Sequence, residues 1–194
     1  MTRITIFDYG AGNLHSLAKA LAMPGVDVRI ENDPNLAIQT DALVLPGVGA
    51  FSGACARLAP GRDAMRRAIL DGLPTLGICL GMQLLFDDSE EGTGQGLGVV
   101  PGRVRKLRAR RVPQIGWNEI ETLDEGIPAI AYFANSYVCE PEDESMIVAY
   151  TTHETDRFAS VVSVAATVGV QFHPEKSTIA GVAFVHQFVQ GVMV

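Results

Sequence analysis

The chain has 194 residues, of which 47% are hydrophobic and 19% charged, a composition typical of a globular protein and not of a disordered one. The net charge of −7 at pH 7 argues against nucleic acid as the main partner, and no apolar run of about 18 residues predicts a membrane span. The three cysteines lack metal-binding spacing, and an acidic residue interrupts the N-terminal stretch where a signal peptide would continue. We expect a single domain over residues 1–194, free thiols and a cytoplasmic location.

Strands alternate with helices in the first half of the chain. Apolar, β-branched segments predict strands at residues 3–10, 26–30, 41–47 and 73–81. Apolar residues at helical spacing predict helices at 13–23, capped by Asn13, at 53–70, interrupted at Pro60 and Gly61, and at 82–88. This alternation predicts an α/β fold, with an open, mostly parallel sheet and helices on both faces.

The second half consists mainly of predicted strands and turns. Residues 112–123, 129–138, 146–152 and 158–172 predict strands that pair antiparallel and join or flank the parallel sheet. A final helix at 177–190 is expected to begin with Ser177 or Thr178 as its cap. This half therefore makes the predicted sheet a mixed one.

Residues 103–111 carry six Lys or Arg in nine positions. Such a patch can bind nucleic acid, but the acidic chain and the lack of interleaved aromatic residues disfavour that interpretation. The alternation from Arg103 to Arg108 is more typical of an exposed strand that enters a turn. We expect a solvated face here, with contact to a partner as the second possibility.

Cys79 lies between Gly77 and Gly81, where the fourth predicted strand meets a helix. A cysteine at such a position is either a small buried hydrophobic residue or a nucleophile that a tight turn presents to a ligand. In open α/β sheets, sites form beyond the carboxyl ends of parallel strands, and Asp8, Gly47 and Cys79 all follow such ends. The position therefore favours chemistry at Cys79.

The segment VGVQFHPEKS at 168–177 supplies a base for this thiol. His173 and Glu175 are two residues apart, so their side chains leave the same face of an extended chain, and Pro174 keeps the backbone out of a helix. A carboxylate beside the imidazole stabilises the imidazolium, which in turn favours the thiolate of Cys79.

Two backbone amides are candidate donors to an oxyanion. Gly47 and Gly49 in LPGVGAF allow the peptide at Val48 to turn its N–H group toward a ligand. The amide of Leu80, at the start of the helix after Cys79, is the natural second donor. Together these groups predict nucleophilic catalysis at a carbonyl carbon.

At this point the sequence resembles a known family. GICLGMQ at 77–83 with QFHPE at 171–175 is similar to the class I glutamine amidotransferases, whose triad matches Cys79, His173 and Glu175. Within that family, the segments DYGAGNLHSL, LPGVGAF, SEEG, PQIGWNEI and HPEKS resemble the glutaminase subunits of imidazole glycerol phosphate synthase nearly end to end. The resemblance implies a flavodoxin-like architecture, and attack of Cys79 on L-glutamine to give a thioester, glutamate and ammonia.

The resemblance also implies a partner. Ammonia would pass to a separate (β/α)8-barrel cyclase subunit of a heterodimer, which forms imidazole glycerol phosphate and aminoimidazole carboxamide ribotide in histidine biosynthesis. It implies no cofactor, metal, nucleic acid or membrane. The residues carried over are the glutamine contacts Gly47, Gly49, Gln83, Ser136 and Tyr137, and, near the subunit interface or ammonia passage, Asn13, Trp117, Tyr132 and Lys176.

One position departs from the family pattern, and several functions stay open. Asn135, in YFANSYV, occupies the place where a histidine is common, and an amide cannot carry the histidine's charge. The alternatives are a glutaminase subunit for anthranilate, guanylate or pyridoxal phosphate synthesis, a stand-alone cysteine hydrolase, and a non-catalytic binding subunit. Two measurements distinguish these cases: whether glutamate release depends on a partner subunit, and whether replacement of Cys79 abolishes the glutamine-dependent reaction.

Overall fold

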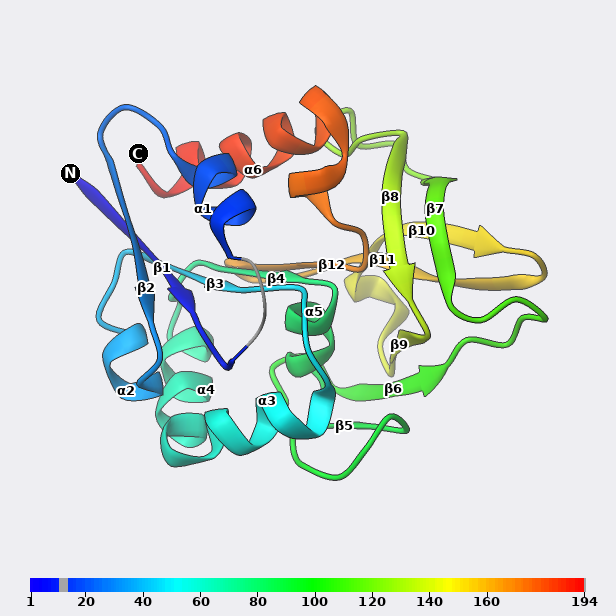
Figure 1. Cartoon of the computed structure of the whole chain (residues 1–194), viewed down its shortest axis with the longest axis horizontal. Coiled ribbons are helices and arrows are strands. Elements are labelled where there is room, and N and C mark those ends of the chain that lie inside the picture. The colour runs from blue at the N-terminus through cyan, green and yellow to red at the C-terminus, as the bar shows by residue number, and fades with distance from the viewer. Residues whose placement is uncertain (11–13, 194) are drawn as a thin grey trace.

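The computed structural model describes residues 1–10 and 14–193 (Figure 1). The helices are α1 (His15–Leu21), α2 (Pro34–Ala37), α3 (Phe51–Leu58), α4 (Arg62–Leu70), α5 (Leu80–Leu84) and α6 (Thr178–Val192), with 3-10 turns η1 (Ala59–Gly61), η2 (Glu144–Met146) and η3 (Pro174–Lys176). The strands are β1 (Thr2–Phe7), β2 (Val26–Glu31), β3 (Ala42–Leu45), β4 (Thr75–Ile78), β5 (Asp88–Ser89), β6 (Gly102–Lys106), β7 (Gln114–Glu119), β8 (Ile130–Asn135), β9 (Tyr137–Pro141), β10 (Ile147–His153), β11 (Asp156–Val164) and β12 (Thr167–Val170).

One mixed sheet runs through the molecule in the order β2-β1-β3-β4-β12-β11-β9-β6-β5, with β10 paired to β11. The strands from β2 to β12 in this order are parallel, whereas β11 pairs antiparallel with β12, β9 and β10. Strands β7 and β8 form a separate antiparallel pair. The predicted α/β architecture, with a parallel half followed by an antiparallel half, is confirmed.

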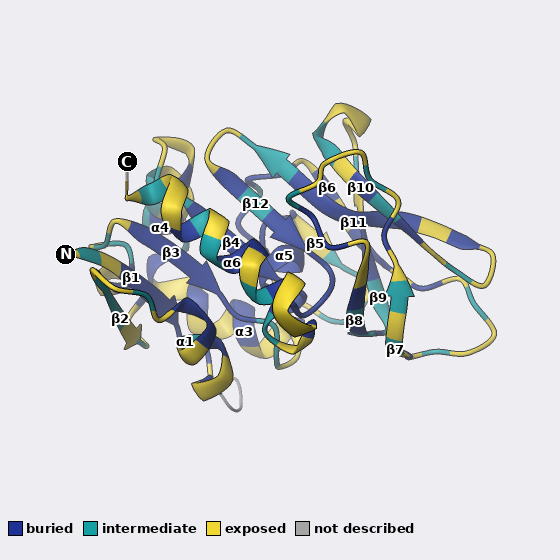
Figure 2. Ribbon diagram, turned by 90° about the horizontal axis from the view of Figure 1, so that it is seen from above, coloured by how far each residue is buried: buried dark blue, intermediate teal, exposed yellow. Residues whose placement is uncertain are grey.

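Helices cover both faces of the parallel strands, with α1 and α6 on one face and α3, α4 and α5 on the other (Figure 1). Alternate residues of each strand face opposite sides, so Val44 packs in the core below α1 and α6, whereas Leu43 and Leu45 pack against α3, α4 and α5. The central strands β3 and β4 are buried, whereas the edge strand β2 and the outer helix faces are partly or fully exposed (Figure 2). No helix in the described ranges is long and apolar enough to cross a bilayer.

Most predicted elements are present, and the differences are local. The helix expected at 53–70 breaks at Pro60 as predicted, where η1 separates α3 from α4. The strand expected at 129–138 is two strands, because the chain leaves the β7–β8 pair at Ser136, whose carbonyl accepts the N–H of Leu107 at 2.9 Å. The short helix α2 was not predicted. Asn13, the expected cap of α1, lies outside the described residues.

Ser177 precedes α6 but does not cap it with its side chain. Its hydroxyl instead donates to the carbonyl of His173 at 2.6 Å and accepts the N–H of Tyr132 at 2.9 Å. The expected cap is therefore a tertiary link, which ties the strand β8 to the segment that begins at His173.

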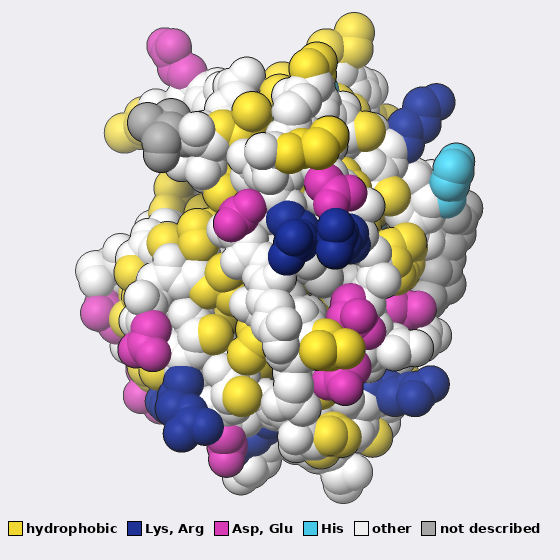
Figure 3. Space-filling view, turned by 90° about the vertical axis from the view of Figure 1, so that its left-hand side faces the viewer, with side chains coloured by type: hydrophobic (Ala, Val, Ile, Leu, Met, Phe, Trp, Pro, Cys, Tyr) yellow, Lys and Arg dark blue, Asp and Glu magenta, His cyan; other side chains and the backbone are white. Residues whose placement is uncertain are grey.

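The expectation that residues 103–111 form a solvated face is wrong at Arg105. This side chain is buried and donates two hydrogen bonds to Asp156, at 2.7 and 2.8 Å. Burial raises the pKa of Asp156, but the bonds from Arg105 and from the amide of Arg108 lower this pKa overall. The face drawn in Figure 3 is a different one, the left-hand side of Figure 1, and on it cationic and anionic side chains lie among one another.

Candidate active site

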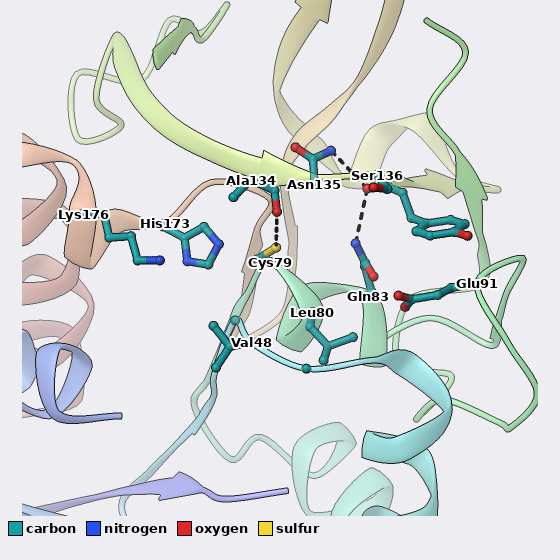
Figure 4. A pocket seen from close by; sticks show the side chains of 13 residues that line it. Val48, Cys79, Leu80, Gln83, Glu91, Ala134, Asn135, Ser136, His173 and Lys176 are labelled. Atoms are coloured by element: carbon teal, nitrogen blue, oxygen red, sulfur yellow. Dashed lines mark hydrogen bonds between the residues drawn. The ribbon is translucent and has the colours of Figure 1, made fainter. Parts of the chain in front are cut away.

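A cavity of about 290 Å³ opens beyond the carboxyl ends of β3 and β4 (Figure 4). Its lining comes from five separate parts of the chain and consists of Gly47, Val48, Gly49, Cys79, Leu80, Gln83, Glu91, Ala134, Asn135, Ser136, Tyr137, His173 and Lys176. The fold thus gathers the predicted nucleophile, base, oxyanion donors and substrate contacts around one space. Asp8 also follows a strand, but it does not line this cavity, and its carboxylate accepts the N–H of Gly10 at 2.8 Å.

Cys79 stands on a strained turn between β4 and α5. Its backbone has φ +47° and ψ −104°, a conformation that costs a residue with a side chain about 1–3 kcal/mol. The N–H of Cys79 is held by the carbonyl of Val170 on β12, at 2.7 Å. Gly81 allows α5 to lie directly against β3, since a Cβ atom there would overlap the backbone carbonyl of Leu45. The turn therefore presents the sulfur at the sheet edge.

The sulfur of Cys79 is nearly enclosed, because the residue is only 5% exposed. It lies 4.0 Å from the carbonyl oxygen of Ala134 and 3.5 Å from the Nε2 atom of Gln171. Gly47 makes this close packing possible: a Cβ atom there would be 2.8 Å from Cε1 of His173 and 3.2 Å from Cβ of Cys79. Gly47 was expected to give the peptide at Val48 freedom to turn, but the structure requires a glycine there for close approach.

His173 and Glu175 form the predicted pair, although through a different backbone. The imidazole Nδ1 lies 2.9 Å from Oε1 of Glu175, and both side chains are almost completely buried. The segment was expected to be extended, but Pro174 begins the 3-10 turn η3, which Pro favours at a first helical position. The N–H of His173 also donates to the carbonyl of Tyr132, at 2.8 Å, which fixes the base against β8.

The imidazole of His173 holds its proton unusually strongly. Burial by itself lowers the pKa of His173, but hydrogen bonds and charge interactions with Cys79 and Glu175 outweigh it and raise this pKa from 6.5 to about 9. The site is therefore arranged as an imidazolium between a sulfur and a carboxylate, which is the charge distribution that nucleophilic attack by a thiolate needs.

We expect the His173 imidazole to titrate near pH 9 when followed by NMR, and Glu175→Gln to lower that midpoint because it removes the carboxylate that stabilises the imidazolium. Because the pKa in the folded chain exceeds the ordinary 6.5, this proton stabilises the fold fully below pH 6.5, and the contribution is lost as pH rises through about 9. A His173 midpoint at or below 6.5 would contradict this charge arrangement.

Val48 and Leu80 lie on the same side of Cys79 (Figure 4). Gly49 has φ +126°, which a residue with a side chain rarely adopts, so the turn after Val48 requires glycine. Within the described ranges the N–H groups of Val48 and Leu80 have no hydrogen-bond partner. Both amides are thus available to an oxyanion that forms beside the sulfur.

The sequence interpretation gave no role to Glu91, which also lines the cavity. Its carboxylate accepts the N–H of Phe51 at 3.0 Å, at the start of α3. A carboxylate can accept further hydrogen bonds, so Glu91 can also bind a cationic group in the cavity. Only folding brings this loop residue to the site, and the one signal for it in the sequence was its place in SEEG, a segment that resembles the family. Lys176, expected near a subunit interface, lines the cavity as well.

Gln83 and Asn135 share one acceptor. The carbonyl of Tyr137 accepts the side-chain amide of Gln83 at 3.3 Å and that of Asn135 at 3.1 Å. The Asn135 amide points away from Cys79 (Figure 4), and its Oδ1 has no partner among the described residues. At this position the asparagine orders the cavity wall and does not approach the sulfur.

The other residues expected at an interface lie on the β7–β8 pair. Trp117 is 53% exposed and stacks edge to face on Tyr132, its cross-strand neighbour, with ring centroids 5.9 Å apart. Exposed Ile115 and Ile130 belong to the same two strands. No group of three or more metal-ligating side chains occurs in the part of the chain that the structure describes. The chemistry available at the site is acyl transfer through a thiolate.

Comparisons with known proteins agree with this geometry. Residues 5–190 match the family model described as glutamine amidotransferase class-I. The chain is 42% identical to the imidazole glycerol phosphate synthase subunit HisH of Synechococcus sp. (strain JA-3-3Ab), over 98% of this chain and 94% of that protein. The subunit of the same name from Pyrococcus furiosus is 43% identical over 97% and 98% of the two chains.

Solved structures show the same fold at lower identity. One described as a glutamine amidotransferase superposes with a TM-score of 0.78 at 18% identity, over 98% of this chain and 99% of that chain. The glutaminase domain of Trypanosoma brucei CTPS, with bound acivicin, superposes with a TM-score of 0.70 at 16% identity, over 100% of this chain and 94% of that chain.

Proposed function

Because this chain belongs to the class I glutamine amidotransferase family, we propose that it is the glutaminase subunit of imidazole glycerol phosphate synthase, with Cys79, His173 and Glu175 as its triad. One observation carries the proposal of these residues: the strained turn presents Cys79 to a cavity that His173 also lines, and His173 is in turn paired with Glu175. Residues 1–194 act as one glutaminase domain, which we place in the cytoplasm.

In the first half of the reaction, the thiolate of Cys79 attacks the side-chain carboxamide carbon of L-glutamine. The oxyanion that forms accepts hydrogen bonds from the amides of Val48 and Leu80, and loss of one such donor costs about 10²–10³ in rate. The imidazolium of His173 gives its proton to the departing nitrogen. The C–N bond breaks, ammonia leaves, and a thioester remains on Cys79.

In the second half, water replaces ammonia beside the thioester. His173, now neutral, takes a proton from this water as its oxygen attacks the thioester carbon. The C–S bond breaks, glutamate leaves, and the thiolate and imidazolium are restored. Glu175 keeps the imidazole oriented through the contact at Nδ1 in both halves.

The cavity fits an amino acid of the size of glutamine. With the carboxamide beside Cys79, the α-ammonium group can reach the carboxylate of Glu91, which is the cavity's acidic side chain. Gly47, Gly49, Gln83, Ser136 and Tyr137 form the remaining walls, as substrate contacts of the proposal.

The partner we propose is the (β/α)8-barrel cyclase subunit, in a heterodimer. Ammonia must reach its acceptor without entering bulk water, where it would be protonated and lost as a nucleophile. The exposed apolar surface of β7 and β8, with Trp117 and Tyr132, suits such a partner. The backbone of Tyr132 also holds His173 and Ser177, so this surface is physically joined to the base. Lys176 follows in the same segment, and Asn13 remains a proposed interface residue outside the described ranges.

The experiment measures glutamate release by the purified chain alone and with the cyclase subunit. We expect release from glutamine to depend on the partner, and glutamine to support formation of imidazole glycerol phosphate in the mixture. Fast turnover of other amides by the chain alone would indicate a stand-alone cysteine hydrolase. Glutamate release without transfer of nitrogen to the cyclase product would contradict the assignment to this synthase.

A further inference from the structure

Gln171 touches the nucleophile but has no role in the reaction described above. The residue is completely buried and does not line the cavity, so it is placed behind the sulfur and away from the substrate. Its Nε2 atom donates to the Sγ atom of Cys79 at 3.5 Å. A buried side-chain N–H group without an acceptor is costly. The sulfur of Cys79 is therefore the hydrogen-bond acceptor for this amide.

The segment from Val170 to His173 holds Cys79 at three points. The carbonyl of Val170 accepts the N–H of Cys79, the amide of Gln171 reaches its sulfur, and His173 supplies the proton partner. Since these residues are consecutive or nearly so, the end of β12 and the segment that follows it set the position of the backbone, the sulfur and the base of the site together. Gln171 is the member that contacts the sulfur from the interior side.

We propose that Gln171 is a positioning residue that fixes the Cys79 thiolate through its N–H group. The inference rests on the proposed function, because it assumes that Cys79 is the nucleophile. A donor to a thiolate stabilises the charged form and holds the sulfur in one rotamer, so that the sulfur faces the carbonyl carbon of the substrate. A neutral amide does this without placing a second cation beside the imidazolium.

Ser160 holds the backbone of Gln171. Its carbonyl accepts the backbone N–H of Gln171 at 2.9 Å. The Oε1 atom of Gln171 is buried and has no partner among the described residues. Nε2 is therefore the atom of this side chain that has a partner, the sulfur of Cys79.

The charged and titratable groups around the sulfur come from several elements. Tyr9 after β1 and Cys139 on β9 are buried, and burial together with the charge of Cys79 raises the pKa of each. Asp8 adjoins Tyr9.

His173 faces the sulfur from the segment that follows β12, with Glu175 behind it. Glu91 and Lys176 line the cavity. None of these except His173 donates to the sulfur, so Gln171 is its neutral donor in the described part of the chain.

The test replaces Gln171 with methionine, which has a similar shape but no donor, in the full chain. Iodoacetamide alkylation of Cys79 is followed by peptide mass mapping as a function of pH, with Cys79→Ala as the background. We expect the pH midpoint of alkylation to rise by about one unit, and the rate at pH values below that midpoint to fall about tenfold, as the loss of one hydrogen bond to a charged group predicts. With the cyclase subunit present, kcat should fall by a similar factor, whereas KM for glutamine should not change.

Thr167→Val is the matched control, since it removes a buried polar group from β12, the strand that leads directly to Gln171, and it should leave both profiles unchanged. If Gln171→Met does not fold, the same readouts on Gln171→Leu decide, because leucine is also close in size and has no hydrogen-bond donor. An unchanged alkylation profile, or a rise in KM at constant kcat, overturns the proposal. If the wild-type chain shows the expected alkylation profile but hydrolyses no glutamine with the cyclase subunit, the proposed function is refuted, whereas the role of Gln171 toward the sulfur is not.

Discussion

Cys79→Ala is expected to lower glutamine-dependent formation of imidazole glycerol phosphate by about 10⁴-fold or more, because removal of a triad nucleophile abolishes the covalent route. The glutaminase assay with the cyclase subunit measures this loss. Ammonium salts should restore synthesis, since they supply the product that the glutaminase hands over. Rescue by ammonium separates a lost nucleophile from a disrupted complex.

Cys55→Ala is the matched control for this loss. Cys55 is also a free, buried cysteine, but it lies on α3, and burial raises its pKa to about 11, so it carries no thiolate at neutral pH. We expect its replacement to retain full glutamine-dependent activity. Undiminished activity of Cys79→Ala would show that the chain is a non-catalytic subunit.

Gly81→Ala is expected to lower the free energy of unfolding by about 3 kcal/mol and to reduce activity, because the added methyl group would force the backbones of α5 and β3 apart. The new Cβ atom would overlap the carbonyl of Leu45, which belongs to the backbone of β3 and cannot rotate away. Relief would require α5 to move away from the sheet, and α5 begins directly after Cys79. Urea denaturation followed by circular dichroism measures the change.

Gly53→Ala provides the contrasting control within a helix. A Cβ atom on Gly53 would have no atom within 4 Å, and the residue lies inside α3. We expect this substitution to raise the free energy of unfolding by about 0.5–1 kcal/mol, because alanine has the higher helix propensity. Equal stability of the two variants would show that the contact between α5 and β3 is not close.

Local pattern was sufficient for much of the fold. The alternation of apolar strands with helical segments predicted the parallel half, since each segment's periodicity shows which side must be buried. Pro60 predicted the break that η1 makes, because proline cannot continue a helix interior. Boundaries set by tertiary contact were missed, such as the separation of β8 from β9 at Ser136, whose carbonyl is engaged by Leu107.

The candidate site shows the same division. The sequence by itself determined which side chains have the chemistry, because a thiol, an imidazole and a carboxylate are recognisable as residue types and the last two are near neighbours in the chain. Only the tertiary structure placed Glu91 in the cavity and Gln171 on the sulfur of Cys79, 92 positions away. It also replaced the expected extended segment after His173 by the turn η3. Contacts between distant residues depend on how whole strands pack, and no spacing along the chain contains that information.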